Sequence, residues 1–242
     1  MEWTFCNRLS LNIDKTKALL FSNRLHDVVT PQLLLINSSP VYQENHLKFL
    51  GVNIDRKLDF SEHVKYICSK ISKTIGILHR VIVNVPRKLL INMYYTLIYP
   101  YFKYCILVWG DNASVHLNPL ILLQKKIIRV INFLHYLAPT RPLFAQMNIL
   151  RLRDIHNYFL GIHMFQQNSS NLLSLSNHTY NTRSRSQALP TFQRLTQTQR
   201  SLSFKGPHCW NKIPTEIRSL NSLCTFKRKY KKFLASAYQD QR

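Results

Sequence analysis

The sequence predicts an α+β fold that is mostly α-helical, with a small antiparallel sheet near the N-terminus. Short apolar runs separated by turn-forming residues are confined to residues 18–54, as is typical of strands. From residue 59 onward, apolar residues recur every three or four positions, as on the buried face of a helix. Glycine is scarce, at five of 242 residues, while 45% of the residues are hydrophobic. This composition favours a packed, largely helical core.

The N-terminal part of the chain is expected to supply the sheet. Residues 3–8 have the character of a helix end, and the apolar runs at 18–21, 33–36 and 47–54 predict three strands. Gly51 falls inside the third run. A glycine there either allows another backbone to approach closely or marks a bulge.

The first long helix is predicted to begin near residue 59. Asp59 and Ser61 are both candidate N-caps, and Pro86 ends the helix. Lys65, Lys73 and Arg80 lie on the face opposite an apolar stripe. The stripe consists of Val64, Ile67, Ile71, Ile75, Leu78 and Ile82.

Residues 87–110 are almost continuously apolar and aromatic, a length that suits a membrane span. Asn92, Pro100 and Lys103 interrupt the run, however. Two buried helices divided at Pro100 are therefore the preferred interpretation, with a membrane helix as the alternative. The tyrosines of this run suit a core, although stacking on bases is the other possibility.

Further helices are predicted at residues 117–133, 152–167 and 222–237. Lys125, Lys126 and Arg129 lie together on the polar face of the first of these, and Lys227, Arg228 and Lys229 lie on the last. Polar residues rich in Ser, Thr, Asn and Gln fill the interval before residue 200. The expected segments are residues 1–58, 59–167, a linker at 168–200 and a small basic module at 201–242.

Charge is distributed unevenly along the chain. Residues 1–64 carry seven basic and seven acidic residues, whereas residues 65–242 carry the other 26 basic and four acidic residues. An excess of this size predicts an anionic partner, because the chain otherwise repels itself. Nucleic acid is the preferred partner, since neutralised phosphates release counterions. A membrane surface or a chaperoned assembly partner is the alternative.

An ordered series of motifs runs along nearly the whole chain. Trp3 is followed by NRLSLNIDKT at residues 7–16, and FLG stands at 49–51. Downstream lie a helix at 63–80, LIYPYFKYC at 97–105, VWG at 108–110, LLQKK at 122–126, YNTR at 180–183, GP at 206–207 and WNKIP at 210–214. The series resembles the last palm motifs, the thumb and the C-terminal region of Jockey-type non-LTR (LINE-type) retrotransposon reverse transcriptases.

The resemblance implies an RNA-directed DNA polymerase whose catalytic centre is not in this sequence. In the family, paired aspartates in a palm hairpin hold Mg²⁺, and that hairpin precedes the motif that begins at Trp3. The present sequence contains no Asp-Asp dipeptide. We therefore expect a palm remnant, thumb and C-terminal module that are inactive alone, with Mg²⁺ needed only by the full-length parent enzyme. Lys15 then matches a general acid for the leaving pyrophosphate, or is a solvated turn lysine.

The same resemblance implies the partners. Phe49, Leu50 and Gly51 match the primer grip, and the basic residues on the three helices would contact a primer–template of RNA and DNA. Alternatively, the basic residues of each helix form a solvent-exposed face that contacts no nucleic acid. The missing fingers and palm of the parent polymerase are the expected protein partner, with no membrane association and with a nuclear or cytoplasmic, not secreted, location. The alternative function is a stand-alone basic nucleic-acid-binding protein, such as a domesticated retroelement remnant.

Overall fold

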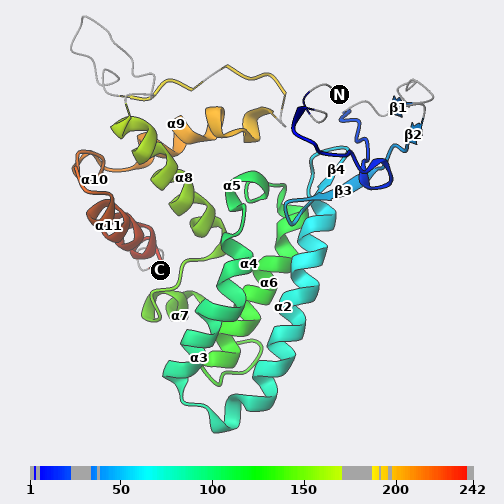
Figure 1. The fold of residues 1–242 in the computed structure, drawn as a ribbon. Coiled ribbons are helices and arrows are strands. Elements are labelled where there is room, and N and C mark those ends of the chain that lie inside the picture. The colour runs from blue at the N-terminus through cyan, green and yellow to red at the C-terminus, as the bar shows by residue number, and fades with distance from the viewer. Residues whose placement is uncertain are drawn as a thin grey trace, which may run out of the picture. The chain divides into compact units, whose positions relative to one another are not determined.

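The computed structural model describes residues 3, 6–22, 34–36, 39–170, 187–190, 192–195 and 198–238. It divides into two compact units, Met1–Lys65 and Tyr66–Arg242. The border falls within helix α2 (Ser61–Val81), which Figure 1 shows in cyan. The border lies within one residue of the step in charge, because the basic excess begins at residue 65.

The N-terminal unit contains two antiparallel hairpins. Strand β1 (Leu34–Ile36) pairs with β2 (Ser39–Val41), and β3 (His46–Phe49) pairs with β4 (Val52–Asp55). Short sheets followed by helices confirm the predicted α+β, mostly α-helical fold. The unit also holds a 3₁₀ turn, η1 (Ile13–Lys15).

Two of the strand predictions were wrong in detail. In the run at 18–21, only Ala18 forms a β-bridge, with Gln43. The run at 47–54 is a hairpin of two strands rather than one strand, since the chain reverses at Leu50 and Gly51. Both residues have positive φ, 45° and 85°, as in the two-residue turns whose twist matches paired strands. An apolar residue in the first turn position concealed this turn from pattern analysis.

The first turn of α2 is fixed by two carboxylates. Asp55 accepts hydrogen bonds from the backbone N–H groups of Lys57, Asp59 and Phe60 at 3.0, 3.0 and 2.6 Å. Asp59 then accepts one from Ser61 N–H at 2.8 Å. These bonds satisfy backbone donors where the helix has no carbonyl partner to offer.

Helix α2 buries the predicted apolar stripe. Val64, Ile67, Ile71, Ile75 and Leu78 are each at most 2% exposed. Ile82, the last predicted member, is half-buried in the following 3₁₀ turn, η2 (Ile82–Asn84).

The apolar run after Pro86 is helical almost throughout. It comprises α3 (Arg87–Met93), the π-helical turn η3 (Tyr94–Ile98), α4 (Tyr99–Lys103) and α5 (Ile106–Trp109). Residues at every fourth position, namely Leu90, Tyr94, Ile98 and Phe102, are fully buried.

The predicted division of this run at Pro100 was wrong. The chain passes Pro100 without leaving the helical conformation, because the wider π turn precedes it and Pro100 occupies the first turn of α4. Proline lacks an N–H, which is tolerated in a first turn. The break comes instead at Cys105, with φ of 50°. Among the described residues, no helix is long and apolar enough to cross a membrane.

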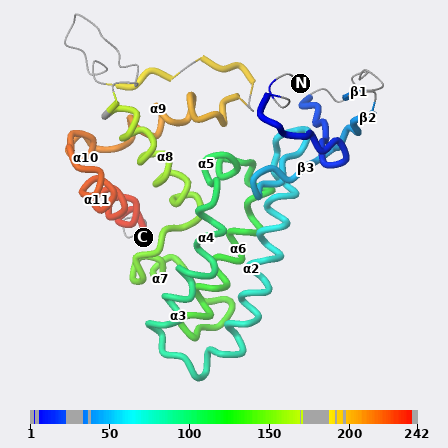
Figure 2. The backbone as a smooth tube through the Cα atoms, in the orientation of Figure 1, coloured from blue at the N-terminus to red at the C-terminus, as the bar shows by residue number. Residues whose placement is uncertain are grey.

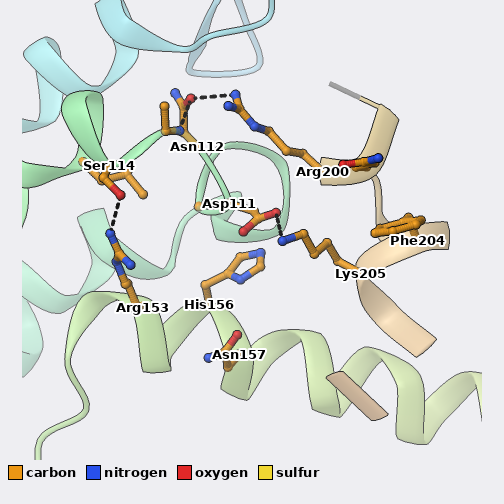
Figure 3. A pocket seen from close by; sticks show the side chains of 13 residues that line it. Asp111, Asn112, Ser114, Arg153, His156, Asn157, Arg200, Phe204 and Lys205 are labelled. Atoms are coloured by element: carbon orange, nitrogen blue, oxygen red, sulfur yellow. Dashed lines mark hydrogen bonds and ion pairs between the residues drawn. The ribbon is translucent and has the colours of Figure 1, made fainter. Parts of the chain in front are cut away.

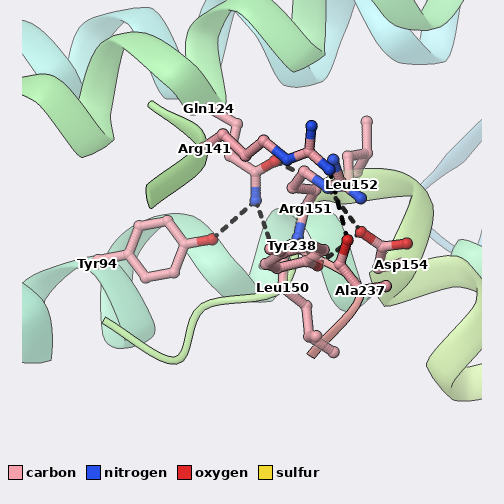
Figure 4. A network of polar contacts seen from close by, with 9 residues as sticks. All are labelled: Tyr94, Gln124, Arg141, Leu150, Arg151, Leu152, Asp154, Ala237 and Tyr238. Atoms are coloured by element: carbon pink, nitrogen blue, oxygen red, sulfur yellow. Dashed lines mark hydrogen bonds and ion pairs between the residues drawn. The ribbon is translucent and has the colours of Figure 1, made fainter. Parts of the chain in front are cut away.

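A buried glutamine connects three parts of the larger unit (Figure 4). Gln124 lies in α6 (Ser114–Ile131) and is 1% exposed. Its Nε2 donates to Tyr94 Oη at 3.1 Å and to the Leu150 carbonyl at 2.9 Å, and its Oε1 accepts from Leu152 N–H at 2.9 Å. Leu150 and Leu152 flank the start of α8 (Leu152–Ser169), which follows α7 (Arg141–Gln146). The amide thereby joins α6, η3 and the entry to α8.

The C-terminal helices are the 3₁₀ turn η4 (Thr198–Arg200), α9 (Leu202–Lys212), α10 (Thr215–Arg218) and α11 (Leu223–Ser236). Of these, α9 and α11 pack on α8, while η4 contacts α9 and α10 contacts α11 (Figure 2). Phe165, Trp210, Phe226 and Tyr230 form an aromatic core in which the Phe165 and Phe226 rings stack at 4.3 Å. The predicted motif at 180–183 and most of the predicted linker lie outside the described residues.

Candidate nucleic-acid interface and polar pocket

The primer-grip-like residues form the tip of the β3–β4 hairpin. Phe49 and Leu50 are 58% and 75% exposed. Gly51 occupies the turn rather than a strand interior, with φ of 85°. The tip therefore offers an exposed apolar surface at a defined hairpin turn.

Lys15 shares a depression with this hairpin. Lys15, Lys48, Phe49, Asn53 and Glu62 are among the residues that line a space of about 800 Å³ within the N-terminal unit. The structure thus brings together two motifs that are distant in the sequence. Lys15 itself is exposed, and its backbone N–H donates to Asn12 Oδ1 at 3.1 Å.

The three basic residues predicted on α2 are all exposed. Lys65 pairs with Glu62 at 2.7 Å, and this pair raises the pKa of Lys65. In the described part of the chain, Lys73 and Arg80 have no acidic partner within ion-pair distance. Lys73 and Arg80 can therefore pair with phosphates without first breaking an ion pair, whereas Lys65 cannot.

The basic residues predicted on α6 differ in their surroundings. Lys126 is exposed, while Lys125 and Arg129 are half-buried. Arg129 Nε donates to the Ala138 carbonyl at 2.8 Å, which holds the turn after the helix. Arg129 thus has a structural contact that the spacing of charges did not indicate.

The basic segment of α11 has one face in the core. Lys227 is half-buried, and Arg228 and Lys229 are exposed. Tyr230, in the middle of the segment, is buried and donates to the Asn157 carbonyl at 3.1 Å. Lys231 is half-buried, and burial lowers its pKa.

A polar pocket of about 440 Å³ lies elsewhere in the larger unit (Figure 3). The turn between α5 and α6 forms one wall, and α8, η4 and α9 provide the others. Three cations enter it: Arg153 from α8, Arg200 from η4 and Lys205 from α9. Among the described residues of its lining, Asp111 is the one acidic residue.

Each cation of the pocket contacts the same turn. Lys205 Nζ lies 3.2 Å from Asp111 Oδ2, Arg200 Nη1 donates to Asn112 Oδ1 at 3.2 Å, and Arg153 Nη2 donates to Ser114 Oγ at 2.7 Å. These contacts hold three side chains from different segments around one space.

His156 forms the floor of the pocket and is 6% exposed. Burial lowers its pKa, and nearby Lys205 acts in the same direction, while Asp111 opposes them. Gly110 allows this packing, since a Cβ there would lie 2.8 Å from His156 Cδ2. The imidazole is therefore mostly neutral at pH 7.

Sequence reasoning did not find this pocket. Its residues come from segments that are far apart in the chain, and none of Arg153, His156, Arg200 and Lys205 belongs to a basic cluster. The one available signal was the VWG motif at 108–110, which ends at the edge of the pocket.

Three residues of the downstream motifs, Trp109, Gly206 and Asn211, make contacts that stabilise the fold. Trp109 Nε1 donates to the Tyr104 carbonyl at 2.8 Å. Gly206 packs against the Met164 sulfur with no space for a Cβ. Asn211 exchanges hydrogen bonds with both backbone groups of Ala188, at 2.9 and 3.0 Å.

Comparison with known proteins finds relatives among polymerases of mobile elements. The chain is 26% identical over 157 residues to a probable RNA-directed DNA polymerase from transposon X-element of Drosophila melanogaster. It is 27% identical over 158 residues to the RNA-directed DNA polymerase from mobile element jockey of the same species, and 26% identical over 156 residues to that of Drosophila funebris. Each match covers 63% of this chain and 17% of the relative.

These similarities confirm the predicted resemblance to reverse transcriptases of non-LTR retrotransposons. No protein-family model matches the chain. No solved structure matches it either.

Proposed function

We propose that this chain binds primer–template nucleic acid as the thumb-side region of a mobile-element reverse transcriptase, and that these 242 residues do not add nucleotides by themselves. The observation that carries the proposal is the similarity to three RNA-directed DNA polymerases. The charge step supports it, because a net charge of +22 resides in residues 65–242, where the helices lie.

The proposed contacts are backbone contacts rather than base contacts. Lys73, Arg80 and Lys126 are exposed on long helices, where they would neutralise phosphates without reading sequence. The exposed tip formed by Phe49 and Leu50 would meet the nucleic acid through apolar contacts instead. Binding by such a surface depends on salt, since every neutralised phosphate releases counterions.

The chemistry of nucleotide addition needs a partner. Polymerases hold two metal ions with carboxylates that clamp the attacking and leaving oxygens. The sequence contains no Asp-Asp dipeptide, and the described residues contain no group of three or more His, Cys, Asp or Glu that could hold a metal ion. The residues present therefore do not fit the two-metal site, and we assign them no catalytic step.

Salt-dependent binding tests the proposal. Fluorescence anisotropy with an RNA–DNA primer–template should give affinities that fall steeply as salt rises. The Lys73→Gln/Arg80→Gln variant should lower the slope of log affinity against log salt by about 2, because it removes two phosphate contacts. Arg87→Gln, which removes one exposed charge of α3, should leave that slope nearly unchanged. An affinity that does not change with salt would refute phosphate binding, and nucleotide incorporation by the purified chain with Mg²⁺ would refute the second half of the proposal.

A further inference from the structure

The polar pocket has the charge of an anion site. Arg153, Arg200 and Lys205 provide three positive charges, and Asp111 offsets one of them. With His156 neutral, the charged side chains of the lining leave an excess of two. Like charges within one space repel each other, and a bound anion would replace that repulsion with attraction.

Hydrogen-bond capacity in the pocket also exceeds what the described residues use. Each guanidinium has five N–H donors, and Arg153 and Arg200 each make one side-chain hydrogen bond to the turn. Asp111 Oδ2 is a buried acceptor in the same lining, and its contact there is the ion pair with Lys205 at 3.2 Å. The donors of the two guanidinium groups nevertheless outnumber the acceptors that the described lining residues offer them.

Asn112 supplies an independent indication of a missing acceptor. Its Oδ1 accepts from Arg200 Nη1 and from Ala113 N–H, so the amide orientation is set and Nδ2 is the donor. Nδ2 is buried and has no hydrogen-bond partner among the described residues. Buried donors in native proteins nearly always have a partner, and a bound acceptor would provide one.

The start of α6 adds a further attraction for an anion. Ala113 and Ser114, at the first turn of this 18-residue helix, line the pocket. Helix N-termini carry partial positive charge and favour phosphate groups. The helix terminus, the three cations and the unpaired amide all act on one space.

We propose that this pocket binds a phosphate monoester as a dianion. The match is one of charge, since a monoester carries about −1.5 to −2 at neutral pH and the lining leaves an excess of two positive charges. An internal phosphodiester carries only one negative charge, so the pocket favours a terminal phosphate: the 5′ end of a nucleic-acid strand, a free nucleotide or inorganic phosphate. The inference goes beyond the proposed function, because the pocket lies on none of the three basic helix faces.

The test compares two oligonucleotides that differ only at the 5′ end. The full chain is titrated by fluorescence anisotropy with a short single strand that carries a 5′-phosphate, and with the same strand that carries a 5′-hydroxyl. We expect the 5′-phosphate strand to bind about tenfold more tightly, since charge-assisted hydrogen bonds to the terminal group are added. If both strands bound and their affinities were equal, the proposal would be overturned.

Variants locate the effect in the pocket. Arg200→Gln and Arg153→Gln should each remove most of the difference between the two strands. Arg87→Gln is the matched control, because Arg87 Nη2 also donates to one asparagine, Asn132 Oδ1, and lies outside the pocket. It should keep the full tenfold difference. Circular dichroism establishes that each variant is folded, and a difference that survives in both Arg200→Gln and Arg153→Gln would overturn the proposal.

Inorganic phosphate separates this inference from the proposed function. Calorimetric titration with inorganic phosphate should give binding that Arg200→Gln weakens about tenfold. If neither oligonucleotide bound while inorganic phosphate did, the phosphate site would stand and the nucleic-acid function would fall. If both oligonucleotides bound equally and inorganic phosphate did not bind, the site would fall and the function would stand.

Discussion

Replacing Gln124 with leucine should destabilise the larger unit by about 3 kcal/mol. The buried amide makes three hydrogen bonds, to Tyr94 Oη, the Leu150 carbonyl and Leu152 N–H. Leucine has a similar volume but leaves these three buried groups without their partner. Each unsatisfied buried group costs about 1–3 kcal/mol, and burial of the apolar leucine returns roughly 1–2 kcal/mol. The expected net loss is a large share of a typical stability of about 5–15 kcal/mol.

Urea denaturation followed by circular dichroism measures this loss as a lower midpoint. Gln146→Leu is the control, since Gln146 is exposed in α7 and its replacement should change the free energy of unfolding by less than about 0.5 kcal/mol. Adding Tyr94→Phe to Gln124→Leu should restore about 1 kcal/mol, because one orphaned hydroxyl is removed with its partner. A loss of stability below about 1 kcal/mol for Gln124→Leu would refute the stabilising role of its three hydrogen bonds. A further loss of stability in the double variant, in place of the expected gain, would refute it as well.

Three further predictions concern other parts of the chain. Leu50→Asn should stabilise the β3–β4 hairpin by about 1 kcal/mol, because leucine at φ of 45° is strained and asparagine tolerates this conformation. Thermal unfolding measures the gain, and an unchanged melting temperature would show that Leu50 is not strained. Tyr238→Phe should cost about 1.5–3 kcal/mol, since the hydroxyl donates to Asp154 at 2.6 Å and accepts from Arg151 N–H at 3.1 Å, and proteolysis at the C-terminus should accelerate accordingly. Burial lowers the folded-state pKa of His156 below 6.5. The unfolded chain therefore binds more protons than the folded chain, and the free energy of unfolding falls as pH drops from 6.5 toward the folded-state pKa. His156→Gln should reduce the slope of this free energy against pH by at most about 1.4 kcal/mol per pH unit, and an unchanged pH profile would exclude a contribution from His156.

Helices with a strong apolar period were predictable from sequence. The stripe that begins at Val64 identified α2, and similar periods identified α6, α8 and α11. In these cases one local rule, burial of every third or fourth residue, determines the element.

Pro100 and Leu50 show where local rules fail. Proline usually ends a helix, yet at Pro100 the preceding π turn removes the conflict. Leucine seldom occupies a turn with positive φ, yet Leu50 does so because β3 and β4 pair on both sides of it. At both places the neighbouring backbone structure overrode the preference of the single residue.

The candidate sites were predictable to different extents. Charge spacing placed Lys73, Arg80 and Lys126 on exposed faces, where the structure has them. The polar pocket was not predictable, since Asp111, His156 and Lys205 meet only after α8 and α9 have packed together. The motif LLQKK drew attention to its two lysines, whereas Gln124 beside them has the buried structural contacts.

The coincidence of the charge step with the unit border has a kinetic consequence. A chain with a nearly neutral unit, Met1–Lys65, of net charge +1, and a strongly basic unit, Tyr66–Arg242, is electrically asymmetric for any angle between the two. A polyanion within about a Debye length, roughly 8–10 Å at physiological salt, exerts a torque on such a molecule before any contact forms. Encounters are thereby biased toward the basic unit, and the neutral unit arrives second. Added salt should therefore slow association more than it speeds dissociation.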